Sequence, residues 1–183
     1  MPRNVGDKSE LAGVSVGKQR SNESRRAPSI GLGESATIAV RRGVEAMERT
    51  AACHCGSLPA IAAGKPENVD LCHCKACQRR TGSAFHFGAT YLKDRVRLES
   101  ARHIYERDTD SGNRIRFHFC PNCGSNLYWE SDRNPAICGI TVGSFADPNF
   151  PLPSYSQWEQ SKHDWLEVAS VTEHFRQGPP HGT

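Results

Sequence analysis

The stretches Cys53-His54-Cys55-Gly56, Cys72-His73-Cys74-Lys75-Ala76-Cys77 and Cys120-Pro121-Asn122-Cys123-Gly124 decide the fold, and they hold seven of the chain's eight cysteines. Cysteines separated by one or two residues point their thiolates at a common centre when the backbone curls around it. Zinc binds such thiolates at about 2.3 Å in a tetrahedron. Pro121 fixes the last turn, and Gly124 permits the positive φ that lets amides face the sulfur atoms. The spacing predicts a metal-binding protein.

The seven cysteines supply four ligands for one closed site and three for a second. The first set would tie the start of the domain to its middle, and structural zinc contributes roughly 10–16 kcal/mol of apparent binding free energy in small peptides. The second set would leave the fourth position of zinc open, as in catalytic sites. We therefore predict one structural and one catalytic zinc ion. Cys53, Cys55, Cys120 and Cys123 could combine as the structural site, which would leave Cys72, Cys74 and Cys77 for the catalytic one.

Spacing alone leaves other partitions open. Cys72 and Cys74 could close the first site instead, or one of three histidines, His73, His86 and His118, could fill the open position of the second. An iron–sulfur cluster suits the single-residue spacing less well. Cys138 alternates with Ile140 and Val142 on one predicted strand face, so we interpret it as a small buried residue outside both sites.

The first 50 residues differ from the rest in composition. They contain no Phe, Tyr or Trp, whereas all fourteen aromatic residues lie from Phe85 onward. They also carry nine Lys or Arg against six Asp or Glu, which accounts for the formal net charge of +3, since residues 51–183 carry fourteen of each. A neutral folded part predicts that the protein binds no nucleic acid, because such binding needs clustered basic residues.

Residues 1–46 are predicted to be a disordered tail, because they hold too little apolar surface to offset the entropy of ordering. An alternative to a disordered tail is that translation begins at Met47, six residues before the first cysteine. The chain has no run of about 18 apolar residues, and Asp7, Lys8 and Glu10 stand where a secretory signal needs apolar residues. We therefore expect a cytoplasmic protein with no membrane partner, in a reducing compartment where paired cysteines bind metal or catalyse.

From Ala51 onward, short stretches of alternating apolar residues predict strands and a mainly β fold. A hairpin turn is expected at Asp110-Ser111-Gly112-Asn113. A single helical turn is expected over Cys74–Arg80, stopped by Gly82. The predicted strands are 85–91, 103–106, 115–119, 127–130, 137–142 and 165–168.

The three cysteine stretches, in their order and spacing, resemble those of the glutathione-dependent formaldehyde-activating family, also called the centromere protein V family. The match continues after the second cysteine stretch with Arg79, Thr81, Gly82 and Ser83. Two later segments, 142–148 (Val-Gly-Ser-Phe-Ala-Asp-Pro) and 161–166 (Ser-Lys-His-Asp-Trp-Leu), resemble the family's closing segments. The resemblance covers about residues 50–176, within a predicted zinc-binding domain of residues 47–178.

The resemblance implies an Mss4-like β-tent stabilised by zinc, with the same partition of the cysteines into a structural and a catalytic site. It also implies a carbon–sulfur lyase that joins formaldehyde to glutathione as S-hydroxymethylglutathione, with a small-molecule thiol and an aldehyde as its partners. The alternative is a non-catalytic zinc-binding interaction module of the centromere protein V type.

Three further residues are candidates for the reaction. A thiol that enters the open position of the Cys72, Cys74 and Cys77 site would lose its proton and attack the aldehyde. His73, between two ligands, is the predicted catalytic proton relay. Arg79 and Arg80 are predicted to bind the two carboxylates of glutathione, the co-substrate.

Overall fold

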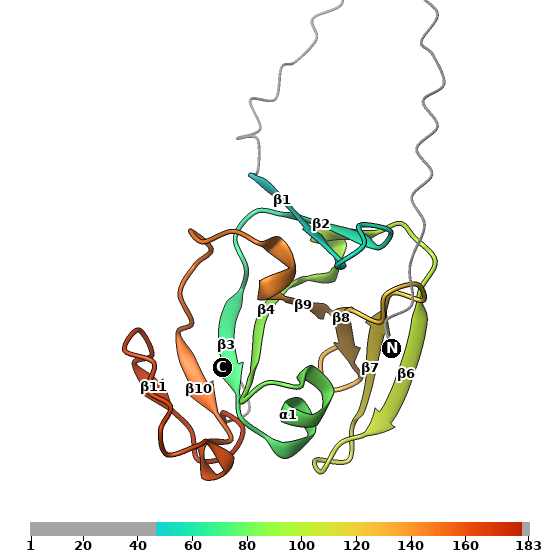
Figure 1. Cartoon of the computed structure of the whole chain (residues 1–183). Coiled ribbons are helices and arrows are strands. Elements are labelled where there is room, and N and C mark those ends of the chain that lie inside the picture. Colours follow the sequence, from blue (N-terminus) through green and yellow to red (C-terminus); the bar gives the residue numbers. More distant parts are fainter. Residues whose placement is uncertain (1–46, 181–183) are drawn as a thin grey trace, which may run out of the picture. The chain divides into compact units, whose positions relative to one another are not determined.

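The computed structural model describes residues 47–180, which form a mainly β domain with eleven strands in two sheets and one α-helix (Figure 1). The smaller sheet has the order β1-β2-β5 and contains β1 (Glu48–Ala52), β2 (Pro59–Ala63) and β5 (Val96–Leu98). The larger sheet has the order β11-β10-β3-β4-β9-β8-β7-β6. Its strands are β3 (Asn68–Cys72), β4 (His86–Leu92), β6 (His103–Asp108), β7 (Arg114–Phe119), β8 (Asn126–Ser131), β9 (Ile137–Thr141), β10 (Tyr155–Gln157) and β11 (Glu173–His174).

The hydrophobic core lies between the smaller sheet and one face of the larger sheet. Cross-strand register places Ala89 opposite both Val69 and Ile140, and Ile140 opposite Tyr128, so these side chains share a face. The smaller sheet contributes buried alanines from β1 and β2, partly buried Val96 and Leu98 from β5, and Leu58 from the turn before β2. The mutually packed buried residues from both sheets include Ala51, Leu58, Ala60, Ala62, Val69, Ala89, Tyr91, Tyr128, Cys138 and Ile140.

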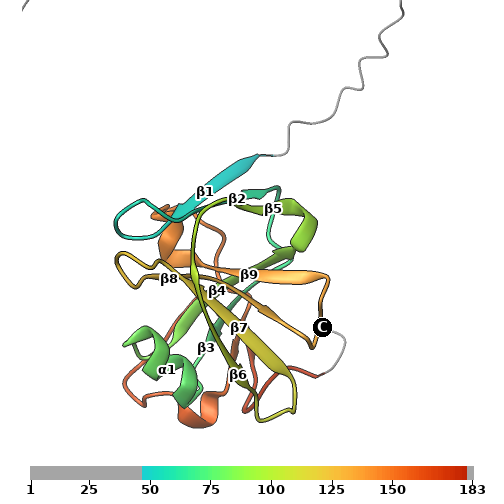
Figure 2. The same cartoon turned by 90° about the vertical axis from the view of Figure 1, so that its right-hand side faces the viewer.

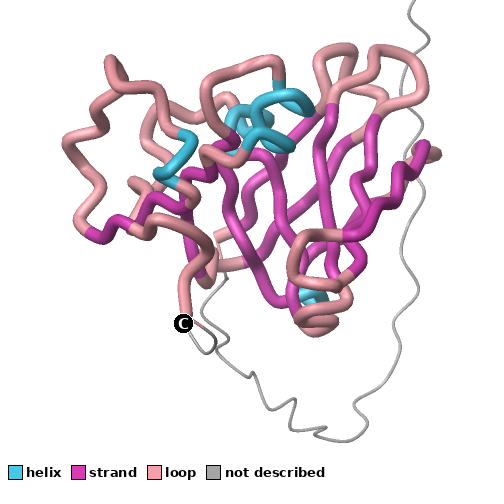
Figure 3. The backbone as a smooth tube through the Cα atoms, turned by 90° about the horizontal axis from the view of Figure 1, so that it is seen from below, coloured by secondary structure: helices cyan, strands magenta, loops and turns pink. Residues whose placement is uncertain are grey.

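The opposite face of the larger sheet carries a cysteine, a histidine and aromatic side chains. Cys72 on β3 pairs with His86 on β4, and farther along this face Trp129 on β8 pairs with both Gly139 and Phe117. Helix α1 (Lys75–Thr81) lies at the end of the domain away from the smaller sheet, as Figures 1 and 2 show. Figure 3 shows how short the helical segments are beside the strands.

Five of the predicted strands are confirmed, as β4, β6, β7, β8 and β9. The hairpin turn between β6 and β7 is also confirmed, since Thr109 N–H donates to the Asn113 carbonyl at 2.7 Å. Helix α1 begins after Cys74, which is its N-cap, and ends at Gly82, which has φ 65° in the left-handed region. The predicted helical turn is therefore confirmed at both ends.

The segment 165–168, predicted as a strand, is not one. Leu166 N–H donates to the His163 carbonyl at 3.0 Å, which closes a turn and prevents an extended backbone. Leu166 and Val168 are apolar because they line a small cavity, not because they form a strand.

The predicted disordered tail at residues 1–46 lies outside the described residues. Within residues 47–180, no helix is long and apolar enough to cross a membrane.

Trp129 packs directly on glycine in the neighbouring strand β9. A Cβ added to Gly139 would lie 1.9 Å from Trp129 Cζ2, whereas one added to Gly143 would meet nothing within 4 Å. We predict that Gly139→Ala lowers the free energy of unfolding by about 1–3 kcal/mol, the usual cost of overpacking. Gly143→Ala is the control and should stay within about 0.5 kcal/mol of the parent protein in urea denaturation. Equal stability of both variants would contradict this packing.

Candidate functional site

The structure brings the seven predicted cysteine ligands together as two separate sets. The sulfur atoms of each set all lie within 4.8 Å of one another. The first set is Cys53, Cys55, Cys120 and Cys123, and the second is Cys72, Cys74 and Cys77. These are the two groups that the sequence predicts.

Two turns of the same construction hold the first set, one between β1 and β2 and one between β7 and β8. In the first turn, Gly56 N–H donates to the Cys53 carbonyl at 2.9 Å, and in the second Gly124 N–H donates to the Cys120 carbonyl at the same distance. Gly56 and Gly124 have φ 77° and 73°, which L side chains rarely adopt. The turns are joined by His54 N–H, which donates to Ser125 Oγ at 3.2 Å.

The spacing of the sulfur atoms in the first set fits zinc. Cys55 Sγ lies 3.6 Å from Cys53 Sγ and 3.7 Å from Cys120 Sγ. A tetrahedral zinc ion with bonds of about 2.3 Å would separate its sulfur ligands by about 3.8 Å. These two separations are close to that value, and all four sulfur atoms lie within 4.8 Å of one another.

Hydrogen-bond donors around the first set favour thiolates. Ser57 lowers the pKa of Cys55 to about 5, since its hydroxyl and its backbone N–H both bond to the sulfur. Ser125 lowers the pKa of Cys123 to about 7 in the same way. Burial raises the pKa of Cys53, although Leu58 N–H donates to its sulfur at 3.2 Å. Metal binding requires deprotonated cysteines, and these hydrogen-bond donors lower the free-energy cost of deprotonation.

The second set lies where β3 runs into helix α1. Cys72 ends β3, Cys74 caps the helix and Cys77 lies in its first turn, where its N–H donates to Cys74 Sγ at 3.3 Å. Hydrogen bonds from Cys72 and Cys77 hold the pKa of Cys74 far below its ordinary value, whereas the bond to Cys74 raises the pKa of Cys72. Three converging sulfur atoms suit a thiophilic cation such as zinc.

No histidine or carboxylate within residues 47–180 joins either set of sulfur atoms. His73, His86 and His118 therefore do not complete the second set in this arrangement. A metal ion held by its three sulfur atoms would keep one tetrahedral position for an external ligand.

An open groove of about 360 Å³ lies between the two sets, and we call it the aromatic groove. It reaches Gly124 in the second turn of the first set, and at its other end Arg80 Nη2 lies 3.9 Å from Cys77 Sγ of the second set. The groove is lined by Arg80, Tyr105, Phe117, Phe119, Gly124 and Asn126.

The structure separates the two arginines that the sequence grouped together. Arg79 is exposed on helix α1 and does not line the groove. Arg80 is half-buried, its guanidinium lies 4.4 Å from the centre of the Phe117 ring, and Nη1 donates to Asn126 Oδ1. Its Nε is buried and has no hydrogen-bond partner within the protein.

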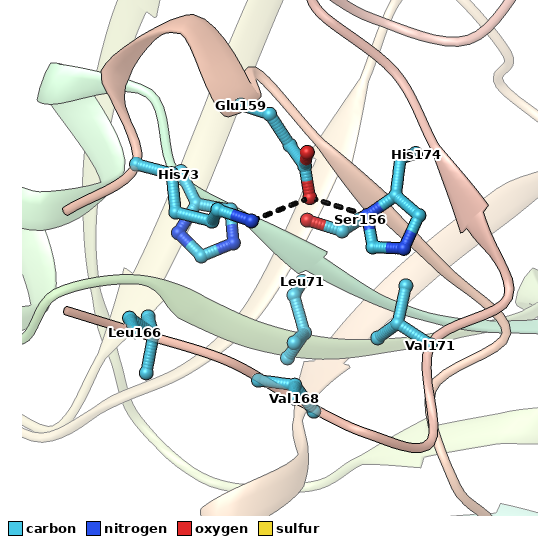
Figure 4. A pocket seen from close by; sticks show the side chains of 9 residues that line it. Leu71, His73, Ser156, Glu159, Leu166, Val168, Val171 and His174 are labelled. Carbon is cyan, nitrogen blue, oxygen red and sulfur yellow. Dashed lines mark hydrogen bonds and ion pairs between the residues drawn. The ribbon is translucent and has the colours of Figure 1, made fainter. Parts of the chain in front are cut away.

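His73 is 1% exposed and lines a different cavity, of about 10 Å³, whose lining includes none of the seven cysteine ligands (Figure 4). Glu159 lines the same cavity, and its Oε1 lies 2.6 Å from His174 Nδ1. The imidazole of His73 packs against Phe85 with 5.7 Å between ring centres. Burial lowers its pKa, which opposes the charged form. Its role as a proton relay stays a prediction.

His86 is the imidazole on the cysteine face of the larger sheet. It is 5% exposed, and neither ring nitrogen has a hydrogen-bond partner. Burial, and to a smaller extent the charge of Arg80, lower its pKa to about 3, while Cys74 opposes them. Cys138, by contrast, is 2% exposed in the core, as predicted.

Several residues of the site were not predicted from the sequence. The serines that bond to sulfur follow a repeated signal, Cys55-Gly56-Ser57 and Cys123-Gly124-Ser125, which could have indicated them. Asn126 and the groove aromatics had no such local signal, because strand pairing and the helix bring them together only in three dimensions.

The family model described as glutathione-dependent formaldehyde-activating enzyme matches residues 48–161, more than half of the chain. The chain belongs to this family. The match includes both cysteine sets, the aromatic groove and helix α1, and it leaves out residues 162–180. Among curated proteins no relative matches. A crystal structure of a Rhodobacter sphaeroides protein is 22% identical, with a TM-score of 0.40, over 54% of this chain and 86% of that chain.

The first cysteine set should carry the stability of the domain. We predict that Cys120→Ser lowers the metal content by one ion per chain and abolishes cooperative thermal unfolding, because metal binding is coupled to folding in such sites. Cys138→Ala, the control in the core, should keep its metal content and unfold cooperatively at a lower temperature. A Cys120→Ser protein that melts like the control would contradict a structural role.

Proposed function

We propose that this protein is a zinc-dependent carbon–sulfur lyase that joins a thiol such as glutathione to formaldehyde, or cleaves the S-hydroxymethyl adduct. The observation that carries the proposal is the three-sulfur set of Cys72, Cys74 and Cys77, which no other metal-binding side chain of the described residues completes. The set lies beside an open groove that holds an arginine. Family membership supports the same reaction class.

Zinc, when bound, would lower the pKa of a thiol ligand and so supply the thiolate at neutral pH. Three cysteine thiolates from this chain would hold it, with the Cys77 N–H bond to Cys74 Sγ fixing one of them. Arg80 Nη2, 3.9 Å from Cys77 Sγ, adds positive charge beside the sulfur atoms. This charge offsets the net −1 charge of a zinc ion held by three thiolates, and so lowers the cost of binding an additional anion such as a thiolate.

Arg80 and the aromatic groove would position the substrate. Asn126 and Phe117 fix the guanidinium, so little side-chain entropy is lost when it binds a carboxylate. Tyr105 and Phe119 form apolar walls that cover the backbone of a peptide-like thiol. Exposed Arg79 has no such support, and we assign the carboxylate to Arg80 alone.

The reaction needs no further reactant. The sulfur of the thiol forms a bond to the aldehyde carbon, the carbonyl π electrons move to oxygen, and the proton lost by the thiol ends on that oxygen. Cleavage is the reverse. Each side is therefore balanced without an oxidant or a reductant, and the protein has to position two molecules and one proton.

Three finer features belong to the same proposal. They are two zinc ions as resident cofactors, an Mss4-like β-tent as the fold, and the cytoplasm as the compartment. The two-sheet β architecture and the two sulfur sets support the first two. The alternative of a non-catalytic interaction module is not favoured, because it leaves the open three-sulfur set and the arginine in the groove without a role.

Removing one sulfur of the second set should abolish most of the activity and leave the fold intact. We predict that Cys74→Ser loses one metal ion per chain and at least 100-fold of the glutathione–formaldehyde exchange rate measured by NMR, because metal-based activation is lost. Its near-UV circular dichroism should match that of the parent protein. Global unfolding of Cys74→Ser would indicate a structural second site, and full exchange activity would exclude the lyase proposal.

The two neighbouring arginines provide a matched pair of variants. Arg80→Ala should raise KM for glutathione about 10- to 100-fold with little change in kcat, since a charge-assisted hydrogen bond contributes roughly 1.5–3 kcal/mol. Arg79→Ala should leave KM within about twofold. With 2-mercaptoethanol, which has no carboxylate, Arg79→Ala should resemble the parent protein, and Arg80→Ala should lose much less than with glutathione, because only its charge beside the sulfur atoms is then missing. Equal KM values for glutathione in the two variants would remove the role of Arg80.

A further inference from the structure

His86 lies directly beside the second cysteine set. It is paired with Cys72 across β3 and β4, and residues directly opposite in antiparallel strands have Cβ atoms about 4.5–5.5 Å apart on the same face. The ring leans along β4, because its Nε2 lies 2.9 Å from the point that a Cβ on Gly88 would occupy. The edge of the ring meets Trp129, with 4.8 Å between ring centres and an interplanar angle of 81°. The position of the imidazole is therefore well defined.

The two ring nitrogens of His86 are buried and have no protein partner. A neutral imidazole has one N–H donor and one acceptor nitrogen, and buried polar groups in proteins nearly always have partners. The other buried histidine on a large-sheet strand differs, since His118 Nδ1 accepts from Arg102 Nε at 2.9 Å. His86 therefore carries two unpartnered ring nitrogens next to Cys72 of the second cysteine set.

We propose that His86 binds the oxygen atom of the aldehyde, which is the hydroxyl oxygen of the S-hydroxymethyl adduct, through one ring nitrogen. The inference rests on the proposed function. As the sulfur–carbon bond forms and the carbonyl π electrons move to oxygen, the His86 N–H donates a hydrogen bond to that oxygen. The proton released by the thiol then completes the hydroxyl group, and His86 keeps its own proton. In cleavage the hydroxyl proton returns to the departing sulfur.

Two features make His86 better placed for this task than the other histidines. His73 lies in a cavity that is lined by no cysteine of the set. His118 pairs with Tyr128 on the opposite sheet face, which belongs to the core. Trp129 and Gly88 hold the His86 ring from one side, so a hydrogen bond to a reacting oxygen costs little reorganisation.

The test uses the full, metal-loaded chain and two substitutions at one position. His86→Phe keeps a flat ring against Trp129 and removes both nitrogens, and His86→Gln restores a side-chain N–H donor. We expect His86→Phe to keep its metal content and its KM for glutathione within about twofold, and to lower exchange turnover about 100-fold, the usual cost of losing one such donor. His86→Gln should recover part of that loss, about tenfold. His118→Phe is the matched control for a lost buried imidazole and should exchange at the parent rate.

A second readout does not depend on turnover. In protein labelled with ¹⁵N-histidine, the ring signals of His86 should shift when preformed glutathione–formaldehyde adduct is added, and should stay within the line width with glutathione alone. Parent-like turnover in His86→Phe, loss of a metal ion from that variant, or unshifted His86 signals would each overturn the inference. If the parent protein shows no exchange, the proposed function fails, and the adduct-dependent signal still decides whether His86 binds the oxygen. The same signal decides the matter if His86→Phe does not fold.

Discussion

The contact on which the rest of the domain depends is the meeting of two turns, 53–58 and 120–125, at four sulfur atoms. One turn belongs to the smaller sheet and the other joins β7 to β8 in the larger sheet. The buried side chains of β1 and β2 are alanines, which bury little apolar area each, so these two strands add only modestly to the hydrophobic contact between the sheets. A metal ion at the four sulfur atoms would add a further connection and close a long loop of the chain.

The two faces of the larger sheet have different roles, because one packs in the core and the other carries the candidate site. One face, with Ala89, Ile140 and Tyr128, packs in the core. The other carries Cys72, His86 and the aromatic side chains that lead into the groove. Because side chains alternate along a strand, each strand contributes to both faces at once, and a residue such as Gly139 is small so that Trp129 can lie across the sheet. The site is thus built on paired strands and one short helix, a rigid support for positioning small substrates.

Much of this arrangement could be predicted from the sequence because it is written in local patterns. The cysteine spacing, the glycines with positive φ and the alternation along β4 and β7 are all short-range signals, and each leads to the structure observed. Six strands were not predicted, because each has five residues or fewer and so shows too little alternation to be recognised. They are β1, β2, β3, β5, β10 and β11. The strand expected at 165–168 was wrong for a related reason. Its apolar residues serve a cavity, and apolar pattern alone does not distinguish that use. The different fates of Arg79 and Arg80 depend on which side of helix α1 faces the groove, which a run of two arginines does not specify.

We propose that the three-sulfur set keeps one metal position for an incoming sulfur. X-ray absorption at the zinc K-edge, on the zinc-loaded full chain with and without glutathione, tests it most directly. With one four-sulfur and one three-sulfur site, the account predicts roughly 3.5 sulfur neighbours per zinc, rising to about 4 when glutathione is added. A sulfur count that does not change with glutathione, together with the scattering pattern of a bound imidazole, would contradict it.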